Sequence, residues 1–467
     1  LKHSAQPKPK GQMKRFSLMA CFILVSFLMG CDEEDRVGSM NTLELLNATA
    51  NGAALRDGDV ELSPELKITL SFSASLDRTT FEEALSLRSG MQDVSIDLNF
   101  SNAASKVSME LLLDPNNQYT LEIINRPIGS NGQSLAKGLR ISFSTGDNEL
   151  ITSLPPCTNA GDCKAGVLIE GSTGPGEFEY YANYPLYETN ARWEELKQAI
   201  IVVHGASSNP DSYFGYLTNT LETLDISDET VLVAPFFKTE TTGDPSDFYW
   251  STFNWREGRL SRNPNKLSSF AALDALISQL ADTSHFPKLN KIVVTGQSSG
   301  GLFTHLYAAA NKVSFNRPDI DLHYQVSESQ YFYYPDGQRI NENSRQLYTP
   351  TSCTGYDLWP FGFEVVPQYL SSISKESFNQ RFKNTHITYI LGDGNGSDNS
   401  LNTRDCAAEL LGSSRYQRGE NMYRYMELRY VGEHVHTKIL VPGVTHNGSA
   451  IYQSTEYKNL LLDLFQQ

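Results

Sequence analysis

The sequence predicts two structured parts, a small all-β sandwich and then an α/β domain whose mostly parallel sheet is covered by helices. Residues 41–147 alternate apolar and polar side chains in several short runs between turn-forming residues, which is typical of a sandwich. From residue 177 onwards, continuous apolar runs such as 199–203 and 231–234 alternate with helical segments. Another such run, 292–295, leads directly into a glycine-flanked serine.

The chain has 467 residues and a formal net charge of −16. Its length allows two or three domains. The first thirty residues hold five basic and no acidic side chains, so without them 33 Lys and Arg face 54 Asp and Glu, a net charge of −21. This excess of acidic groups argues against nucleic acid or an anionic membrane surface as the main partner.

The N-terminal segment has the pattern of a secretory signal. The sequence does not begin with Met, and Met13 is the favoured initiator, followed by a basic end and an apolar run too short to span a membrane. The run ends in Leu-Met-Gly-Cys31, which resembles the lipobox of bacterial lipoproteins. The resemblance implies a signal over 1–31, a lipid on Cys31, and an acidic tether over 32–44. It places the protein on the bacterial cell envelope outside the cytoplasm, at the outer membrane or the periplasmic face; a plain signal peptide is the alternative.

Four cysteines remain after this segment, an even number that suits an oxidising compartment. Four cysteines allow three pairings, and we favour Cys157–Cys163, which are close in sequence, together with Cys353–Cys406. A zinc site is the competing interpretation, but no CxxC pair is present.

The β-rich region resembles the bacterial Ig-like domains of secreted proteins, and we assign this domain to residues 45–147. Such domains serve as spacers or as protein-contact modules, and the region has no histidine, cysteine or carboxylate cluster that indicates chemistry. Residues 148–176 are expected to be a linker, and 177–467 the α/β domain.

The turn after the run 292–295 reads Gly-Gln-Ser298-Ser-Gly, the pattern G-x-S-x-G. A nucleophile on a sharp turn from strand to helix needs strained backbone, and bulky neighbours would collide with the strand and the helix. The N-terminus of the following helix favours negative charge near the serine. The pattern predicts Ser298 as a nucleophile; an ordinary loop is the alternative.

Residues 178–467 resemble the α/β-hydrolases. Besides the serine turn, three strand ends carry the resemblance, at 202–206 (Val-Val-His-Gly-Ala), 390–393 (Ile-Leu-Gly-Asp) and 441–446 (Val-Pro-Gly-Val-Thr-His). The order serine, acid, histidine along the chain is that of the triad on this fold.

The resemblance implies a role for each group. His446 would accept the proton of Ser298, because a serine hydroxyl is a weak nucleophile at neutral pH. A carboxylate would hold the imidazole in one tautomer. The backbone amides of Ala206 and Ser299 would bind the oxyanion of the tetrahedral intermediate.

The acid is less well defined, because the position where the family usually has it is Asn395. Asp393 and Asp398 are the two candidates, and we favour Asp398, since Asp393 is almost on the strand end. The same loop alternates oxygen-bearing side chains as a calcium loop does, but the twelfth position is Arg404 rather than a glutamate. No metal or cofactor is expected.

The other histidines are predicted to be structural. His204 is expected to shape the oxyanion loop, and His305 to pack along the helix after the serine. His434 and His436 form an H-x-H pair, but on a strand they point to opposite faces and so make a poor metal site.

Aromatic clusters at 248–256 and 330–335 follow strands near the predicted cleft. Exposed, they would suit an aryl, sugar or polyester substrate; packing within the core of a lid is the alternative. A Cys353–Cys406 bond would hold Asp398 in register.

The sequence therefore predicts an extracytoplasmic serine hydrolase that cleaves carboxylic esters through an acyl-enzyme. Its substrate would be a small or polymeric ester, and its membrane partner would be reached through the lipid anchor. A catalytically silent binding or scaffold lipoprotein and a serine peptidase are the alternatives.

Overall fold

The computed structural model describes residues 42–147, 150–188, 190–243, 247–313, 317, 319–394, 400–403 and 405–466. The predicted signal, the lipidation residue Cys31 and the favoured acid Asp398 lie outside these ranges.

The N-terminal β region forms two five-stranded sheets around one apolar core. Alternating residues supply this core; in the central strand β5, for example, Leu66, Ile68 and Leu70 are buried. The sheets confirm the predicted all-β sandwich, and the likeness to Ig-like domains stays a prediction. In spatial order the first sheet contains β3 (Ala53–Ala54), β2 (Leu45–Ala50), β5 (Glu65–Phe72), β9 (Lys106–Leu112) and β8 (Leu98–Ser101). The second contains β4 (Asp59–Leu62), β12 (Leu139–Thr145), β10 (Gln118–Ile123), β6 (Leu85–Ser89) and β7 (Gln92–Asp93).

Short elements complete this region. They are the pair β1 (Thr42–Leu43) and β11 (Ser134–Leu135), helix α1 (Arg78–Ala84) and the 3₁₀ turn η2 (Asn102–Ala104). Asp77 caps α1 by accepting a hydrogen bond from the Thr80 amide.

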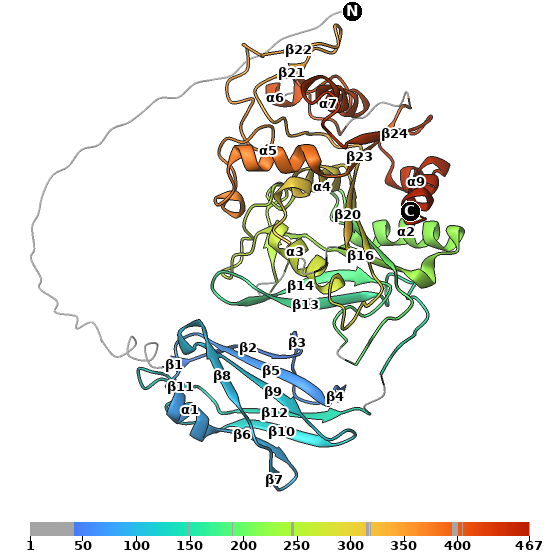
Figure 1. Ribbon diagram of the computed structural model, residues 1–467. Coiled ribbons are helices and arrows are strands. Elements are labelled where there is room, and N and C mark those ends of the chain that lie inside the picture. The colour runs from blue at the N-terminus through green and yellow to red at the C-terminus, as the bar shows by residue number, and fades with distance from the viewer. Residues whose placement is uncertain are drawn as a thin grey trace, which may run out of the picture. The chain divides into compact units, whose positions relative to one another are not determined.

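The second region is built on an eight-stranded mixed sheet, whose strand β20 stands in Figure 1 between α3 and α4 on one side and α2 and α9 on the other. Within the described sheet β14 runs opposite to the other seven strands, and the six strands from β16 onwards are parallel to one another. In spatial order the strands are β13 (Lys164–Glu170), β14 (Pro175–Ala182), β16 (Thr230–Pro235), β15 (Gln198–Val203), β19 (Lys291–Gln297), β20 (Asp321–Ser327), β23 (Ile387–Gly392) and β24 (Thr437–Val441).

Strand β13 corrects the predicted linker over residues 148–176. The segment 164–170 pairs with β14 along its whole length, so the sheet begins before residue 177. The sequence concealed this strand because it lies at the sheet edge and buries only Val167.

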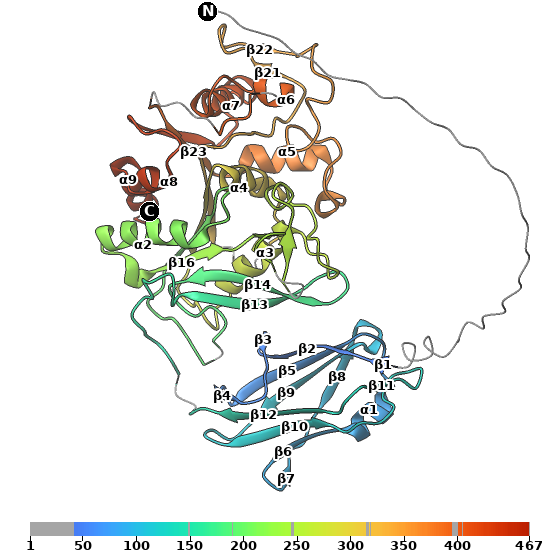
Figure 2. The same cartoon turned by 180° about the vertical axis from the view of Figure 1, so that it is seen from behind.

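Both faces of the sheet are covered, as the continuous apolar runs predicted. In β15, Ile201 and Val203 belong to the core on the side of α3 and α4, whereas Ile200 and Val202 face α2 and α9. Figure 2 shows α2, α8 and α9 grouped apart from α3, α4 and α5. The helices are α2 (Pro210–Leu224), α3 (Ser269–Leu280), α4 (Ser299–Ala310), α5 (Lys375–Asn384), α6 (Cys406–Glu409), α7 (Arg415–Arg429), α8 (Gly448–Tyr452) and α9 (Thr455–Phe465).

The connections carry short elements of their own. They are the 3₁₀ turns η3 (Ser227–Glu229), η4 (Trp255–Glu257) and η5 (Gln368–Leu370), the pair β17 (Lys238–Thr239) and β18 (Tyr249–Trp250), and the pair β21 (Arg339–Ile340) and β22 (Leu347–Tyr348).

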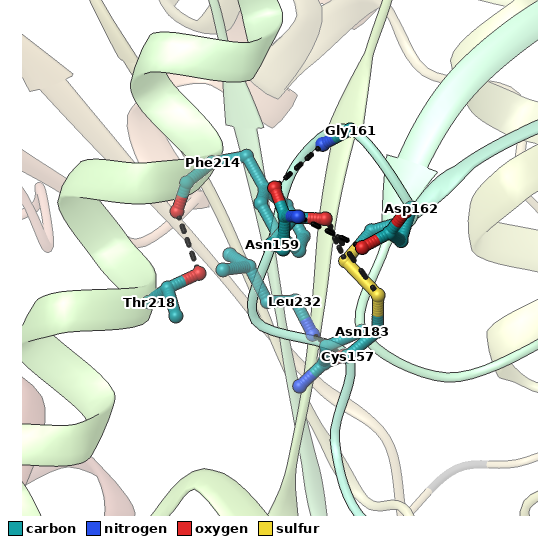
Figure 3. The surroundings of a disulfide bond; sticks show 9 residues. Cys157, Asn159, Gly161, Asp162, Asn183, Phe214, Thr218 and Leu232 are labelled. Carbon is teal, nitrogen blue, oxygen red and sulfur yellow. Dashed lines mark hydrogen bonds between the residues drawn. A yellow bond between two sulfur atoms is a disulfide. The ribbon is translucent and has the colours of Figure 1, made fainter.

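Both favoured disulfides, Cys157–Cys163 and Cys353–Cys406, are present. Figure 3 shows the first of them, which closes a small loop beside β16. The amide of Cys157 donates to the carbonyl of Asn183, 2.8 Å away, and the side chain of Asn183 accepts from the amide of Leu232 at 2.7 Å. The loop is thereby attached to the main sheet.

Candidate active site

Ser298 occupies the turn between β19 and α4, with φ of 62° and ψ of −116°. A non-glycine residue with positive φ costs about 1–3 kcal/mol and persists only where its surroundings enforce it. The amide of Ser298 donates to the carbonyl of Ser327 on β20 at 3.0 Å, and its own carbonyl accepts from the amide of Leu302 at 3.1 Å. The serine is therefore held by the sheet on one side and by the first turn of α4 on the other.

The glycines of the turn are required by close backbone contacts. A Cβ atom on Gly296 would lie 2.3 Å from the carbonyl oxygen of Gly300, and one on Gly300 would lie 2.1 Å from that of Val203. A Cβ atom on Gly301 would lie 2.6 Å from the carbonyl oxygen of Ser327. These distances confirm the prediction that larger residues would collide with the strand and the helix.

His204 is completely buried at the end of β15. Its Nδ1 lies 2.8 Å from the carbonyl oxygen of Gly205, and its Nε2 accepts a hydrogen bond from the Phe237 amide at 3.1 Å. These partners define a neutral ring with its proton on Nδ1, and burial lowers its pKa to about 4. The ring thus holds the start of the loop that carries Ala206, in line with a shaping role.

A tyrosine that the sequence did not single out links the turn to α2. The hydroxyl of Tyr213 donates to Oε1 of Gln297, the residue before the serine, at 2.5 Å. A Cβ atom on Gly205 would come within 2.9 Å of the same hydroxyl, and one on Gly448 within 3.5 Å. Tyr213 therefore packs between the 204–206 loop, the serine turn and the segment after His446. Its position at the start of a helix directly after the His-Gly loop is the only signal in the sequence.

His446 lies five residues beyond β24, just before Asn447, which caps α8 by accepting from the Ala450 amide. Its Nδ1 is 3.4 Å from the hydroxyl oxygen of Ser400. Burial, together with the positive charge of Arg415, lowers the pKa of His446 to about 4. The ring is therefore neutral at pH 7, the form that a general base needs.

Asp393, the second candidate acid, is exposed. Its Oδ1 accepts a hydrogen bond from the amide of Gly443 at 2.7 Å, which directs this carboxylate to the turn after β24. Asp398 and Asn395 lie outside the described residues.

Glu328 is a buried carboxylate that the sequence reasoning missed. It follows β20 and has φ of 46°. It is 3% exposed, and its Oε1 accepts from the Gly392 amide at 2.6 Å. Burial raises the pKa of Glu328 to about 7, against the lowering effects of this hydrogen bond and of Arg415. The only signal in the sequence was an acidic residue directly after a buried strand.

The serine turn opens on a cleft of about 520 Å³. Ser298 and His446 both line it, as do Ala206 and Ser299, whose amides were predicted to bind an oxyanion. The described residues that line the cleft are Gly205, Ala206, Ser207, Asn209, Tyr213, Phe253, Arg256, Gln297, Ser298, Ser299, Leu302, Gln330, Tyr331, Ser400, Asn402, Arg415 and His446.

Most of the aromatic residues near the cleft are core residues, which favours the packing alternative over an exposed aromatic surface. Trp250, Trp255 and residues 332–334 are all fully buried. Each cluster contributes one ring to the cleft, Phe253 from the first and Tyr331 from the second.

Two further histidines, His305 and His436, are packed in the core. His305 is fully buried between Phe332 and Phe382, with Nε2 3.4 Å from the Tyr333 carbonyl. His436 is hydrogen-bonded through both ring nitrogens, to the hydroxyl of Tyr389 and to the carbonyl of Phe382. Among the residues that the structure describes, no cluster of three potential metal ligands occurs, and no helix is long and apolar enough to cross a membrane.

No known family model matches the sequence, and no curated protein matches it significantly. Solved structures match about two thirds of the chain. One is a poly(3-hydroxybutyrate) depolymerase from Bordetella parapertussis, with 16% identity and a TM-score of 0.45 over 65% of this chain and 92% of the other. Another is poly(aspartic acid) hydrolase-1 from Sphingomonas sp. KT-1, with 18% identity and a TM-score of 0.45 over 66% and 100%. A third is a siderophore hydrolase from Aspergillus nidulans, with 14% identity and a TM-score of 0.37 over 67% and 98%.

Proposed function

We propose that the protein is a serine hydrolase that cleaves carboxylic esters through an acyl-enzyme. The observation that carries this proposal is the strained backbone at Ser298, which is enforced by close glycine contacts at the N-terminus of α4 and opens on a cleft shared with His446. Strain of this kind is costly and is concentrated at functional sites.

In the proposed reaction the hydroxyl oxygen of Ser298 forms a bond to the ester carbonyl carbon while His446 takes its proton. The oxyanion accepts hydrogen bonds from the amides of Ala206 and Ser299. The bond to the alcohol oxygen then breaks, and the proton on His446 goes to the departing alcohol. Water attacks the acyl-enzyme with His446 again as base, which releases the carboxylic acid and restores Ser298.

For the acid that orients His446 we propose Asp398. The hydrogen bond from Gly443 to Asp393 supports this choice, because it occupies the competing carboxylate in a different turn. The Cys353–Cys406 bond supports it as well, since it anchors the chain shortly after the loop that contains Asp398.

The test is hydrolysis of a short- to medium-chain p-nitrophenyl ester series by a soluble form that begins after Cys31. We expect turnover in the wild type and its loss in Ser298→Ala and in Asp398→Asn, with Asp393→Asn as the matched control that keeps most of the activity. Turnover retained in a folded Ser298→Ala variant would refute the proposal. Loss in Asp393→Asn alone would move the acid to that residue.

We further propose a lipid anchor on Cys31 and a location outside the cytoplasm. Two disulfides support an oxidising compartment. Labelled palmitate should be incorporated into the full chain expressed in a bacterium and not into Cys31→Ser. Equal labelling of both would contradict the anchor.

A further inference from the structure

Arg256 is a buried cation in the wall of the cleft, and the proposed reaction does not use it. It belongs to η4 and is 9% exposed. One terminal nitrogen, Nη1, donates to the hydroxyl oxygen of Ser299 at 3.2 Å. The guanidinium carbon lies 4.6 Å from the centre of the Phe253 ring and 5.5 Å from that of Tyr331.

The charge of Arg256 is not matched by an ion pair within the described part of the chain. The neighbouring carboxylate, Glu257, is instead bound to Nε of Arg259 at 2.9 Å. Nε of Arg256 is buried and has no hydrogen-bond partner among the described residues. Arginine stays charged in proteins, and buried charges are normally paired, so this guanidinium has donor capacity left for a ligand.

Two buried arginines, Arg256 and Arg415, line the cleft although the chain as a whole is acidic. Arg415, from the start of α7, is 4% exposed, and its Nη2 donates to Oε1 of Gln330 at 3.0 Å. No aspartate or glutamate is among the described residues that line the cleft. Because the charge of Arg415 interacts with that of Glu328, it is Arg256 that offers this acidic protein a binding group for an anion in the cleft.

We infer that the cleft takes esters that carry a carboxylate close to the scissile bond, and that Arg256 binds this carboxylate. The inference rests on the proposed ester hydrolysis and names its substrate class. The carboxylate must lie near the reacting carbon, because Arg256 touches Ser299, the residue next to the nucleophile. A guanidinium offers two parallel N–H donors that match the two oxygens of a carboxylate.

The test compares esters that differ only in this charge. For a carboxylate on the acyl side, the pair is mono-p-nitrophenyl adipate and its methyl ester; for one on the alcohol side, it is 4-acetoxybenzoate and its methyl ester. We expect the wild type to have a kcat/KM at least about tenfold higher for the charged member of one pair, because hydrogen bonds to charged groups commonly contribute that much or more. The preferred pair shows on which side of the ester the carboxylate is bound.

In Arg256→Met the ratio of kcat/KM within the preferred pair should fall by about 10- to 100-fold. Arg256→Lys should keep part of the preference for the charged ester, since lysine keeps the positive charge but lacks the two parallel N–H donors of the guanidinium. Arg262→Met is the matched control, a change of an exposed arginine in the same segment that pairs with Glu240 and lies outside the cleft, and should leave the ratio unaltered.

Two results would overturn the inference. One is a wild type that does not distinguish the members of either pair. The other is an equal fall for both members in Arg256→Met, which would mean that this residue only positions Ser299. Failure of the proposed function would give a different result. In that case the protein would hydrolyse none of the four esters, and Ser298 would not react with a fluorophosphonate.

Discussion

The two sides of the cleft are built in different ways. The nucleophile side is one continuous segment, β19 to α4, in which hydrogen bonds and backbone contacts leave Ser298 a single conformation. The opposite side is assembled from loops after β20, β23 and β24, which bring Gln330, Ser400 and His446 to the same cleft. A local motif therefore encodes the first side, whereas only the folded sheet forms the second.

The difference in construction implies a difference in tolerance. On the nucleophile side a single added methyl group meets backbone oxygens, which cannot rotate away. On the other side the contacts are made by side chains and charges, so substitutions there should alter protonation more than shape. The following predictions test this contrast.

The largest effect is expected on the assembled side at His446. In the proposed mechanism His446→Gln removes the base of the serine, so kcat should fall by about 10⁴- to 10⁶-fold, as at the histidine of subtilisin. His386→Gln, at an exposed histidine stacked on His323, is the matched control and should keep its rate. Ester hydrolysis by both variants measures this; a His446→Gln variant within tenfold of the wild type would remove His446 from the mechanism.

The next effect concerns shape. Gly300→Ala places a Cβ atom 2.1 Å from the Val203 carbonyl oxygen and should lower the free energy of unfolding by about 1–3 kcal/mol or more. Gly215→Ala, in the middle of α2 with open space around it, should instead raise it by about 0.5–1 kcal/mol. Urea unfolding of the two variants checks the pair. Equal effects would show that the turn is not sterically constrained.

Glu328 should make stability depend on pH. Its pKa is raised from an ordinary value near 4.5 to about 7, so the folded state favours the protonated carboxyl. The resulting stabilisation is complete below pH 4.5 and is lost as the pH rises through 7, by up to about 3 kcal/mol. Glu328→Gln removes the titrating group, so urea unfolding at pH 5 and pH 8.5 should show a smaller loss of stability in the variant. A wild type and variant with parallel pH profiles would contradict this.

The smallest effect is a shift in the pH profile of activity. Arg415 lowers the pKa of His446, so Arg415→Met should raise that pKa and move the acid limb of kcat/KM to higher pH. Arg415→Lys keeps the charge and should leave the limb close to its wild-type position. An unmoved limb in Arg415→Met would show that the two groups are not coupled.

The same contrast explains what could be predicted from the sequence. The G-x-S-x-G turn and the apolar strands were predictable because each depends on neighbours within a few residues. His446 was chosen from the family resemblance, and the structure places it in the same cleft as Ser298. The edge strand β13 was missed, since one buried residue leaves no periodic signal. Tyr213, Glu328 and Arg256 were also missed, because their partners come from distant segments: Gln297, Gly392 and the pair Ser299 and Tyr331.

The most direct test of the central claim is reaction of the soluble protein with a fluorophosphonate, followed by mass spectrometry of the intact chain and of its peptides. We expect one adduct per chain, located on Ser298, and none in Ser298→Ala. His446→Gln should react far more slowly while remaining folded. An adduct on another residue, or a folded wild type that does not react, would contradict the assignment of Ser298 as the nucleophile.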